Sequence, residues 1–492
     1  MVVRPPPAPA PPAPAPSAQA PHAKPLSARI ELVLPPGQAD ALTCLPGITA
    51  QPPFPVSIAW HDTPDGALAA AGLSLTLSGQ RWSLEAIHAA NHLLPSPPLR
   101  QEDRRELLGS DVPAATAPYA TLAGSRRHLD WDGGVVLTLL QGRIPGDRGP
   151  GLCRVWLEGP QASLHSLGST LAATLRAEVP RASLAADVLT RTGRIAPPVS
   201  LQACTVHPGQ DVAGAMAHLL QQLCATMLHW ADRVPARTGP EPVHQMRVVL
   251  RRLRSALSVF HRATPCPTLT TLAAPAKDLA AQLGAARDWD VFLDGTGAVM
   301  AAAFSDDPRS RALLRAARRA RDAAYVNLCA MLDGPGFRTF ALTLAATAGL
   351  RSWTDDPALH TPIDVFAAQA LARRMRHVRH AGRGIAALSV PALHELRKDC
   401  KRLRYTAEFF APLFPQHPVR RFTRRLAAIQ EELGLFNDGA AVAGLLSQLG
   451  RYERGYAAGL ATGLSTAATG PARTRIEARW HRFRTVDPFW AR

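Results

Sequence analysis

Two segments of the chain carry basic side chains in the same order. His244–Arg254 reads H-Q-M-R-V-V-L-R-R-L-R, His394–Arg404 reads H-E-L-R-K-D-C-K-R-L-R, and the two begin 150 residues apart. Guanidinium groups offer planar pairs of donors that match phosphate oxygens, and a histidine adds a donor whose charge depends on pH. These residue types in this order indicate binding of a phosphate-rich anion.

Helical periodicity gathers the basic residues of each segment on one face. At 100° per residue, apolar residues such as Leu250 and Leu403 lie on the opposite face. Cations three or four residues apart repel each other, and a bound anion would remove that repulsion. The first basic row consists of His244, Arg247, Arg251, Arg252 and Arg254, and the second of His394, Arg397, Lys401, Arg402 and Arg404.

A basic helix face can also be a solvated surface with no ligand. Glu408 follows Arg404 by one helical turn and could pair with it. The appearance of one pattern twice in one register favours a functional role over that interpretation. Additional basic surface is predicted at Arg318, Arg373 and Arg374.

The repeat extends beyond the two basic rows. The same offset carries Phe260 onto Phe410, Leu283-Gly284 onto Leu433-Gly434, and Asp288 onto Asp438 without a gap. We therefore predict an internal duplication, with copies at about 211–352 and 361–492. We expect Asp288 and Asp438 to have a structural role in orienting the arginines.

Residue composition and hydrophobic periodicity divide the chain into regions. Residues 1–27 form a Pro/Ala-rich tail that we predict to be disordered, and residues 28–196 contain strand-like runs punctuated by Gly and Pro. Predicted strands include R-I-E-L-V-L, P-V-S-I-A-W, L-S-L-T-L-S, G-V-V-L-T-L-L and C-R-V-W-L-E, with a helix near 162–175. Residues 197–205 form the predicted linker. Residues 206–492 are rich in Ala, Leu and Arg with helical periodicity, which predicts an all-helical domain.

Charge is distributed unevenly over the 492 residues. The chain has 55 Lys and Arg against 38 Asp and Glu, a net charge of +17, of which +16 falls in residues 201–492. This asymmetry indicates an anionic partner such as polyphosphate, nucleic acid or a membrane surface. Seven cysteines without a C-x-x-C pair, and no apolar run long enough for a membrane span, predict a soluble cytoplasmic protein.

The helical region resembles the CHAD domain, the conserved histidine α-helical domain. The resemblance rests on Val243–Phe260, Leu283–Val291, Glu395–Phe410 and Leu433–Asp438. It implies two pseudo-symmetric four-helix bundles around a basic groove that binds inorganic polyphosphate, in proteins associated with polyphosphate granules. The resemblance places the family's histidine and basic ligand positions at these residues: His244, Arg247, Arg251, Arg254, His394, Arg397, Lys401 and Arg404.

The N-terminal region is similar to CYTH domains, which often precede CHAD. Trp60–Leu75, W-H-D-T-P-D-G-A-L-A-A-A-G-L-S-L, carries the resemblance. It implies a β-rich α+β tunnel or barrel, in a family where many members hydrolyse triphosphates with a divalent metal. The expected fold class is therefore multidomain, with a CYTH-like domain followed by an all-α CHAD domain.

Residues that the CYTH-type reaction needs are largely missing. The family's E-x-E-x-K reads Arg29-Ile30-Glu31-Leu32-Val33, and the positions of two strand arginines and a lysine hold Thr76, Ser78 and Ile87. Arg154 and Trp156 stand where acidic residues are usual, which leaves Glu31 and Glu158 as weak metal candidates. We expect a degenerate domain without catalysis, metal or cofactor.

Two alternatives to polyphosphate binding remain open. A metal-dependent triphosphatase could be rebuilt around Glu31 and Glu158. A nucleic-acid binder could also use arginine faces, although aromatic residues make up 6% of the chain and none interleaves with the basic rows as in single-strand binders.

Overall fold

The computed structural model describes residues 28–87, 116–195, 204–262, 267–351, 353, 356–452, 455–467 and 472–491. For residues 86, 437–441, 451–452, 467 and 472 it describes the backbone without the side chain. The Pro/Ala-rich tail, most of the linker and the side chain of Asp438 lie outside the described residues.

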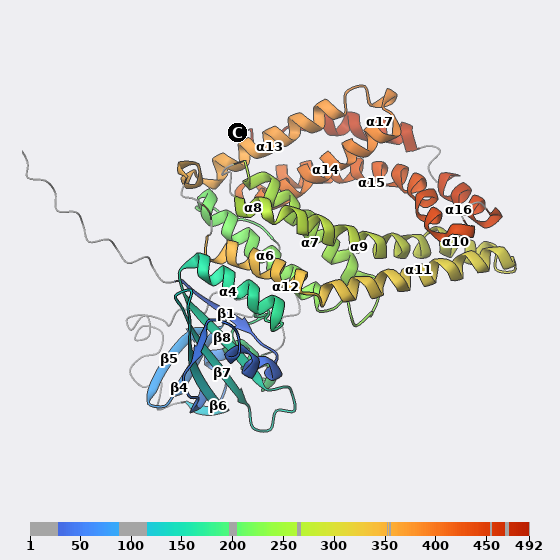
Figure 1. Cartoon of the computed structure of the whole chain (residues 1–492). Coiled ribbons are helices and arrows are strands. Elements are labelled where there is room, and N and C mark those ends of the chain that lie inside the picture. Colours follow the sequence, from blue (N-terminus) through green and yellow to red (C-terminus); the bar gives the residue numbers. More distant parts are fainter. Residues whose placement is uncertain are drawn as a thin grey trace, which may run out of the picture.

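The N-terminal region folds into a curled antiparallel sheet (Figure 1). Its order is β1-β8-β7-β6-β3-β4-β5, with β2 paired to β6. The strands are β1 (Ala28–Val33), β2 (Ile48–Ala50), β3 (Phe54–Asp62), β4 (Leu73–Ser78), β5 (Arg81–Ala86), β6 (Ala117–Trp131), β7 (Val135–Arg143) and β8 (Leu152–Gly159). Short helices accompany them: α1 (Ala39–Thr43), α2 (Ala67–Ala70), α4 (Gln161–Thr174) and α5 (Leu184–Arg191).

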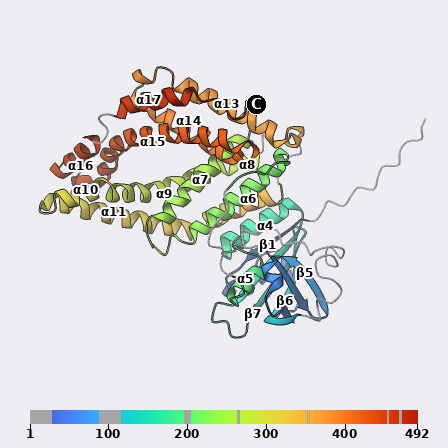
Figure 2. The same cartoon turned by 180° about the vertical axis from the view of Figure 1, so that it is seen from behind.

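Alternation along the strands gives this sheet two different faces. Ile30, Leu32, Val155 and Leu157 are buried in the core that continues into α4 and the helical region. Their sequence neighbours Arg29, Glu31 and Trp156 line the hollow side of the sheet instead. Figure 2 shows the sheet from behind, with α5 beside the strands.

The remainder of the chain is helical. The elements are α6 (Val212–Ala231), α7 (Glu241–Phe260), α8 (Pro267–Thr271), α9 (Ala273–Asp294), α10 (Thr296–Ala303), α11 (Pro308–Leu332), α12 (Pro335–Gly349), α13 (Ile363–Ala381), α14 (Val390–Phe410), α15 (Gln416–Leu446), α16 (Tyr456–Ala467) and α17 (Ala472–Arg484). Polar caps begin several of them: the side chains of Asp211 and Ser389 accept hydrogen bonds from the first-turn amides of α6 and α14.

The helix bounds follow the 150-residue repeat. Helices α6, α7 and α9 correspond to α13, α14 and α15, while the span of α11 corresponds to α16 and α17 together. The two copies are also joined symmetrically where their first helices begin. Val212 N donates to Thr361 O at 3.1 Å, and Ile363 N donates to Gln210 O at 3.0 Å.

The sheet and the helical region share one continuous core. Helix α4 packs along α12, where Gly168 allows Leu342 to approach closely. Arg338 Nε donates to Ala172 O at 3.0 Å, and His165 contacts Thr343 at 3.2 Å. Across the described helices, none combines the length and apolarity that crossing a membrane requires.

Candidate functional site

The two basic rows lie on α7 and α14, which contact each other directly (Figure 1). Arg251 Nε donates a hydrogen bond to the hydroxyl of Tyr405 at 2.9 Å. Arg252 Nη2 forms an ion pair with Glu408 Oε2 at 2.8 Å. The fold therefore brings the C-terminal halves of the two rows together.

Several cationic side chains of the first row lie close together where α7 packs against α9. Arg247 Nη1 lies 3.4 Å from Asp288 Oδ1, and the Arg247 side chain is 25% exposed. Burial lowers the pKa of His244, and the charges of Arg287, Arg251 and Arg247 lower it further. Burial also lowers the pKa of Arg247. Asp288 beside Arg247 and Glu241 near His244 thus offset only part of the positive charge of this cluster.

The second row is more strongly compensated by acidic side chains. Glu408 Oε1 accepts from Arg404 Nε at 2.8 Å, so this carboxylate binds one arginine from each row. Arg402 pairs with Asp399 at 2.7 Å. His394, Arg397 and Lys401 are each partly exposed along the same helix. Part of the second row is therefore neutralised within the protein.

Two glycines repeat the same contact in both copies. A Cβ at Gly284 would lie 3.0 Å from Arg247 Nη1, and a Cβ at Gly434 would lie 3.3 Å from Arg397 Nη2. The Leu-Gly pair of the sequence repeat is therefore where α9 and α15 make room for an arginine of the neighbouring basic row. Asp288 contacts the arginine of its own copy, as stated above, and the side chain of Asp438 is outside the described part.

The remaining predicted ligand residues lie on α7, α11 and α13. Arg374 Nη2 of α13 donates to Ser258 Oγ of α7 at 2.9 Å, which places Arg374 against the first copy. Arg254 is exposed on α7, and Arg373 is partly exposed on α13. Arg318 is exposed on α11, which packs mainly on α9.

Sequence reasoning missed three side chains that support the rows. Tyr405 and Gln430 anchor arginines: Gln430 Oε1 accepts from Arg404 Nη1 at 3.3 Å, while Gln430 Nε2 donates to Cys400 O at 2.6 Å. Arg287 adds charge beside His244. Tyr405 directly follows the R-L-R of the second row, where the first row has Ser255, and this asymmetry was the available signal.

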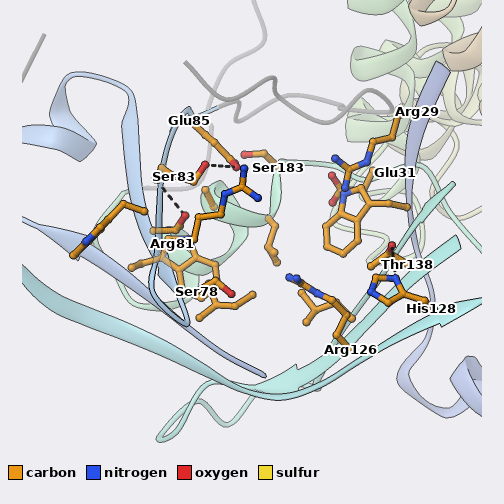
Figure 3. A pocket seen from close by; sticks show the side chains of 18 residues that line it. Arg29, Glu31, Ser78, Arg81, Ser83, Glu85, Arg126, His128, Thr138 and Ser183 are labelled. Atoms are coloured by element: carbon orange, nitrogen blue, oxygen red, sulfur yellow. Dashed lines mark hydrogen bonds between the residues drawn. The ribbon is translucent and has the colours of Figure 1, made fainter. Parts of the chain in front are cut away.

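A separate cavity of about 610 Å³ lies on the hollow side of the N-terminal sheet (Figure 3). Its lining includes Arg29 of β1, Arg81 of β5 and Arg126 of β6. Thr76 and Ser78 also line it, so the sequence placed these two uncharged positions in the lumen. Positive charge nevertheless enters the cavity, because these arginines come from strand positions other than those that the CYTH resemblance implies.

Comparisons with known proteins identify the helical region. Residues 218–447 match the family model of the CHAD domain. The chain contains a CHAD domain. No curated protein matches the chain.

Three solved structures are similar to the chain. The CHAD domain from the plant Ricinus communis is 28% identical, covers 58% of this chain and 97% of its own, and has a TM-score of 0.47. PptA from Streptomyces chartreusis is 18% identical and has a TM-score of 0.44; the match covers 55% of this chain and 100% of PptA. HpAC1 from Hippeastrum is described as a candidate adenylyl cyclase with a dominant triphosphatase activity. It is 14% identical and has a TM-score of 0.25, and the match covers 35% of this chain and 98% of HpAC1.

The described residues of the N-terminal sheet do not fit the divalent metal that the sequence resemblance to CYTH domains implies. Glu31 Oε1 is paired with Arg154 Nη1 at 3.1 Å, and both side chains are 4% exposed. Burial raises the pKa of Glu31. Glu158 is exposed and opposite Arg29 in the strand register, outside the cavity lining. Among the described residues, no three His, Cys, Asp or Glu side chains come together as metal ligands do.

Asp62 is the first acidic residue of the Trp60–Leu75 run that carries the CYTH resemblance, and its hydrogen bonds are made within the fold. Its buried carboxylate accepts hydrogen bonds from the amides of Thr63, Leu68 and Ala69 at 2.8, 2.9 and 3.2 Å. It thereby caps the short helix α2. This part of the CYTH resemblance therefore reflects folding rather than metal binding.

Proposed function

We propose that the CHAD domain binds inorganic polyphosphate along the two basic rows of α7 and α14. The observation that carries the proposal is the junction of the rows, where Arg251 of the first copy bonds Tyr405 of the second at 2.9 Å. Arginines one helical turn apart are spaced by about 5 Å, which allows successive side chains to follow a linear chain of phosphates.

Positive charge that is only partly compensated in the first row supports an anionic ligand. His244, Arg247 and Arg251 lie close enough for their charges to oppose one another, with Asp288 as the carboxylate against Arg247. A bound polyanion would replace that repulsion with charge-assisted hydrogen bonds. The excess of +16 in residues 201–492 supports the same ligand class.

Polyphosphate is favoured over nucleic acid because the rows carry charge without stacking residues. Single-strand binders alternate basic side chains with exposed aromatic rings. Here Tyr405 is 8% exposed and its hydroxyl is held by Arg251. A ligand that offers phosphates and no bases therefore matches the site best.

Competition between polyanions tests the proposal. Labelled long-chain polyphosphate is bound to the full-length protein and challenged with duplex DNA at equal phosphate concentration. We expect unlabelled polyphosphate to displace the label and DNA to leave it bound. Equal displacement by DNA contradicts the proposal.

Charge reversal tests the residues. Changing Arg247, Arg251, Arg397 and Lys401 together to Glu should abolish polyphosphate binding while circular dichroism shows an unchanged helical signal. The matched control reverses four exposed arginines of α11: Arg309, Arg311, Arg315 and Arg319. Retained binding in the first variant, or equal loss in both, contradicts the assignment.

Polyphosphate binding of this kind would concentrate the protein on cytoplasmic polyphosphate granules. A fluorescent fusion of the wild-type chain should therefore form foci that stain for polyphosphate. The fusion of the four-residue α7 and α14 variant should be diffuse under the same conditions.

A further inference from the structure

A cleft of about 570 Å³ lies between the C-terminal ends of α13 and α17. Figures 1 and 2 show both helices on the opposite side of α14 and α15 from α9 and α11. The floor of the cleft is apolar, because Ile385 and Trp480 line it and each is 5% exposed. The Trp480 ring packs against Gly382, where a Cβ would lie 2.1 Å from it. Close packing fixes the indole in place, and the volume of the cleft is within the range of ligand sites.

Helix α17 has two faces that differ in charge compensation. Arg475 and Arg479 face α15, where their Nε atoms lie 2.8 and 3.8 Å from the carboxylate oxygens of the buried Glu432. At 100° per residue, Trp480 and Arg484 lie about 140° and 180° around the helix from Arg475. They therefore belong to the opposite face, which lines the cleft.

Positive charge in the cleft is only partly compensated. Arg379, Arg383 and Arg484 line it together with one carboxylate, that of Glu477. Within the part of the chain that the structure describes, none of these three arginines forms an ion pair. The lining therefore has an excess of about two positive charges at neutral pH. His481 adds a donor whose charge depends on pH.

The cleft is separate from the two basic rows of α7 and α14. Arg374 of α13 donates to Ser258 of α7 at 2.9 Å, so this side of α13 faces the first copy. At 100° per residue, Arg379 lies about 140° around α13 from Arg374. The two arginines therefore lie on different sides of α13, and the cleft is not a continuation of the rows.

We propose that this cleft binds an acidic peptide segment of a partner protein, in which apolar side chains separate the carboxylates. Carboxylates match the planar donor pairs of Arg379, Arg383 and Arg484. The apolar side chains of the peptide pack on Trp480 and Ile385, which form the floor. Tryptophan and arginine are among the residue types in which the hot spots of protein interfaces are enriched.

The mixed chemistry of the lining favours a peptide over other anions. Glu477 repels a chain of phosphates, but its carboxylate accepts hydrogen bonds from the N–H groups of a peptide. The apolar floor of the cleft gives a phosphate chain no partner, whereas a peptide buries apolar side chains there. A bilayer surface is too broad to enter a cleft of this volume.

Fluorescence anisotropy with the full-length protein tests the proposal. The probe is a fluorescein-labelled peptide in which pairs of glutamates alternate with single leucines. Two comparison peptides replace every glutamate by glutamine, or every leucine by serine. We expect the probe to bind at submillimolar concentration and both comparison peptides to bind at least about tenfold more weakly. A probe that does not bind at millimolar concentration, or a leucine-free peptide that binds equally well, overturns the proposal.

Variants locate the binding. Arg379→Gln with Arg484→Gln should weaken the probe at least about tenfold, because two charge-assisted contacts are lost. The matched control is Arg376→Gln with Arg482→Gln, which removes the same charge from the same two helices outside the cleft lining. All four arginines are exposed, so both variants should fold, and circular dichroism checks this. Equal affinity in the two variants overturns the proposal.

Two further measurements separate this site from sites for other anions. The cleft variant should retain polyphosphate affinity, and Arg247→Gln with Arg397→Gln in the basic rows should retain probe affinity. Loss of probe binding in the basic-row variant contradicts a site between α13 and α17, whatever the result for polyphosphate. Vesicles that contain phosphatidylglycerol should leave the probe bound. If they displace it from the wild type, the cleft belongs to a lipid surface and the proposal is overturned.

Discussion

The guanidinium of Arg247 lies directly against Gly284, at a position where any Cβ would come within 3.0 Å of Nη1. The second copy repeats this relationship between Arg397 and Gly434. Each glycine lies within a helix, where alanine would be more stable by about 1 kcal/mol. Glycine at these two positions therefore leaves room for the arginines, although alanine would make each helix more stable.

Gly284→Ala should weaken polyphosphate binding several-fold without destabilising the protein. The new methyl group displaces the Arg247 guanidinium, while the helix gains up to about 1 kcal/mol. Gly444→Ala on α15 is the matched control, because no atom lies within 4 Å of a Cβ there. Polyphosphate affinity and chemical denaturation are measured for both, and equal affinities would show that the glycine contact is irrelevant to binding.

Polyphosphate affinity should rise as the pH falls below neutrality. The pKa of His244 is lowered by burial and by its arginine neighbours, so the unliganded side chain is neutral at pH 7. A polyanion stabilises the protonated form, so binding takes up a proton and strengthens as the pH decreases through this range. Titrations between about pH 5 and 8 should show a shallower pH dependence in His244→Gln. An unchanged dependence would place the titrating group elsewhere.

Glu408→Gln should increase polyphosphate affinity while it lowers stability. Glu408 pairs with Arg252 and Arg404, each at 2.8 Å, so its neutralisation releases positive charge in both rows. All three side chains are partly exposed, and the loss in unfolding free energy should be about 1 kcal/mol. Glu477→Gln on α17 removes the same charge from the domain as a control. Weaker binding in Glu408→Gln would mean that the ion pairs position the arginines for the ligand.

Arg154→Leu should strongly destabilise the N-terminal sheet at neutral pH. It leaves the carboxylate of Glu31 buried without its ion-pair partner, which costs about 3–5 kcal/mol. Glu31 has its pKa raised by burial, so the variant should regain stability as the pH falls and the carboxyl group takes up a proton. Thermal unfolding between about pH 7 and 5 tests this.

The double variant Glu31→Gln with Arg154→Leu is the control for this prediction. It removes the charge and should be more stable than Arg154→Leu alone at pH 7. A single variant as stable as the wild type would show that Arg154 does not neutralise Glu31.

The helical region could be predicted closely from the sequence because its signal is repeated. The fixed offset between the copies located α7 and α14, and the 3.6-residue period separated Leu250 and Leu403 from the basic faces. Contacts between the copies, such as Arg251 with Tyr405, could not be predicted, since they depend on how two distant helices cross.

The sheet was harder to interpret. Strand alternation correctly predicted β1, β3, β4, β7 and β8, but β6 was missed because A-P-Y-A-T-L-A-G-S-R-R-H-L-D-W alternates poorly. Its pairing with β2, β3 and β7 holds it extended despite that pattern. Arg81 and Arg126 therefore escaped notice, because their strands had not been predicted.

The salt dependence of polyphosphate affinity in paired variants tests the central claim most directly. Arg247→Gln with Arg397→Gln is compared with Arg315→Gln and Arg319→Gln, two exposed arginines of α11 that carry the same total charge. The basic-row pair should bind more weakly and show a smaller dependence on salt, because two phosphate contacts are lost. The α11 pair should match the wild type in both respects. If both pairs lose affinity and salt dependence equally, polyphosphate responds to the overall charge of the domain and not to a site on α7 and α14.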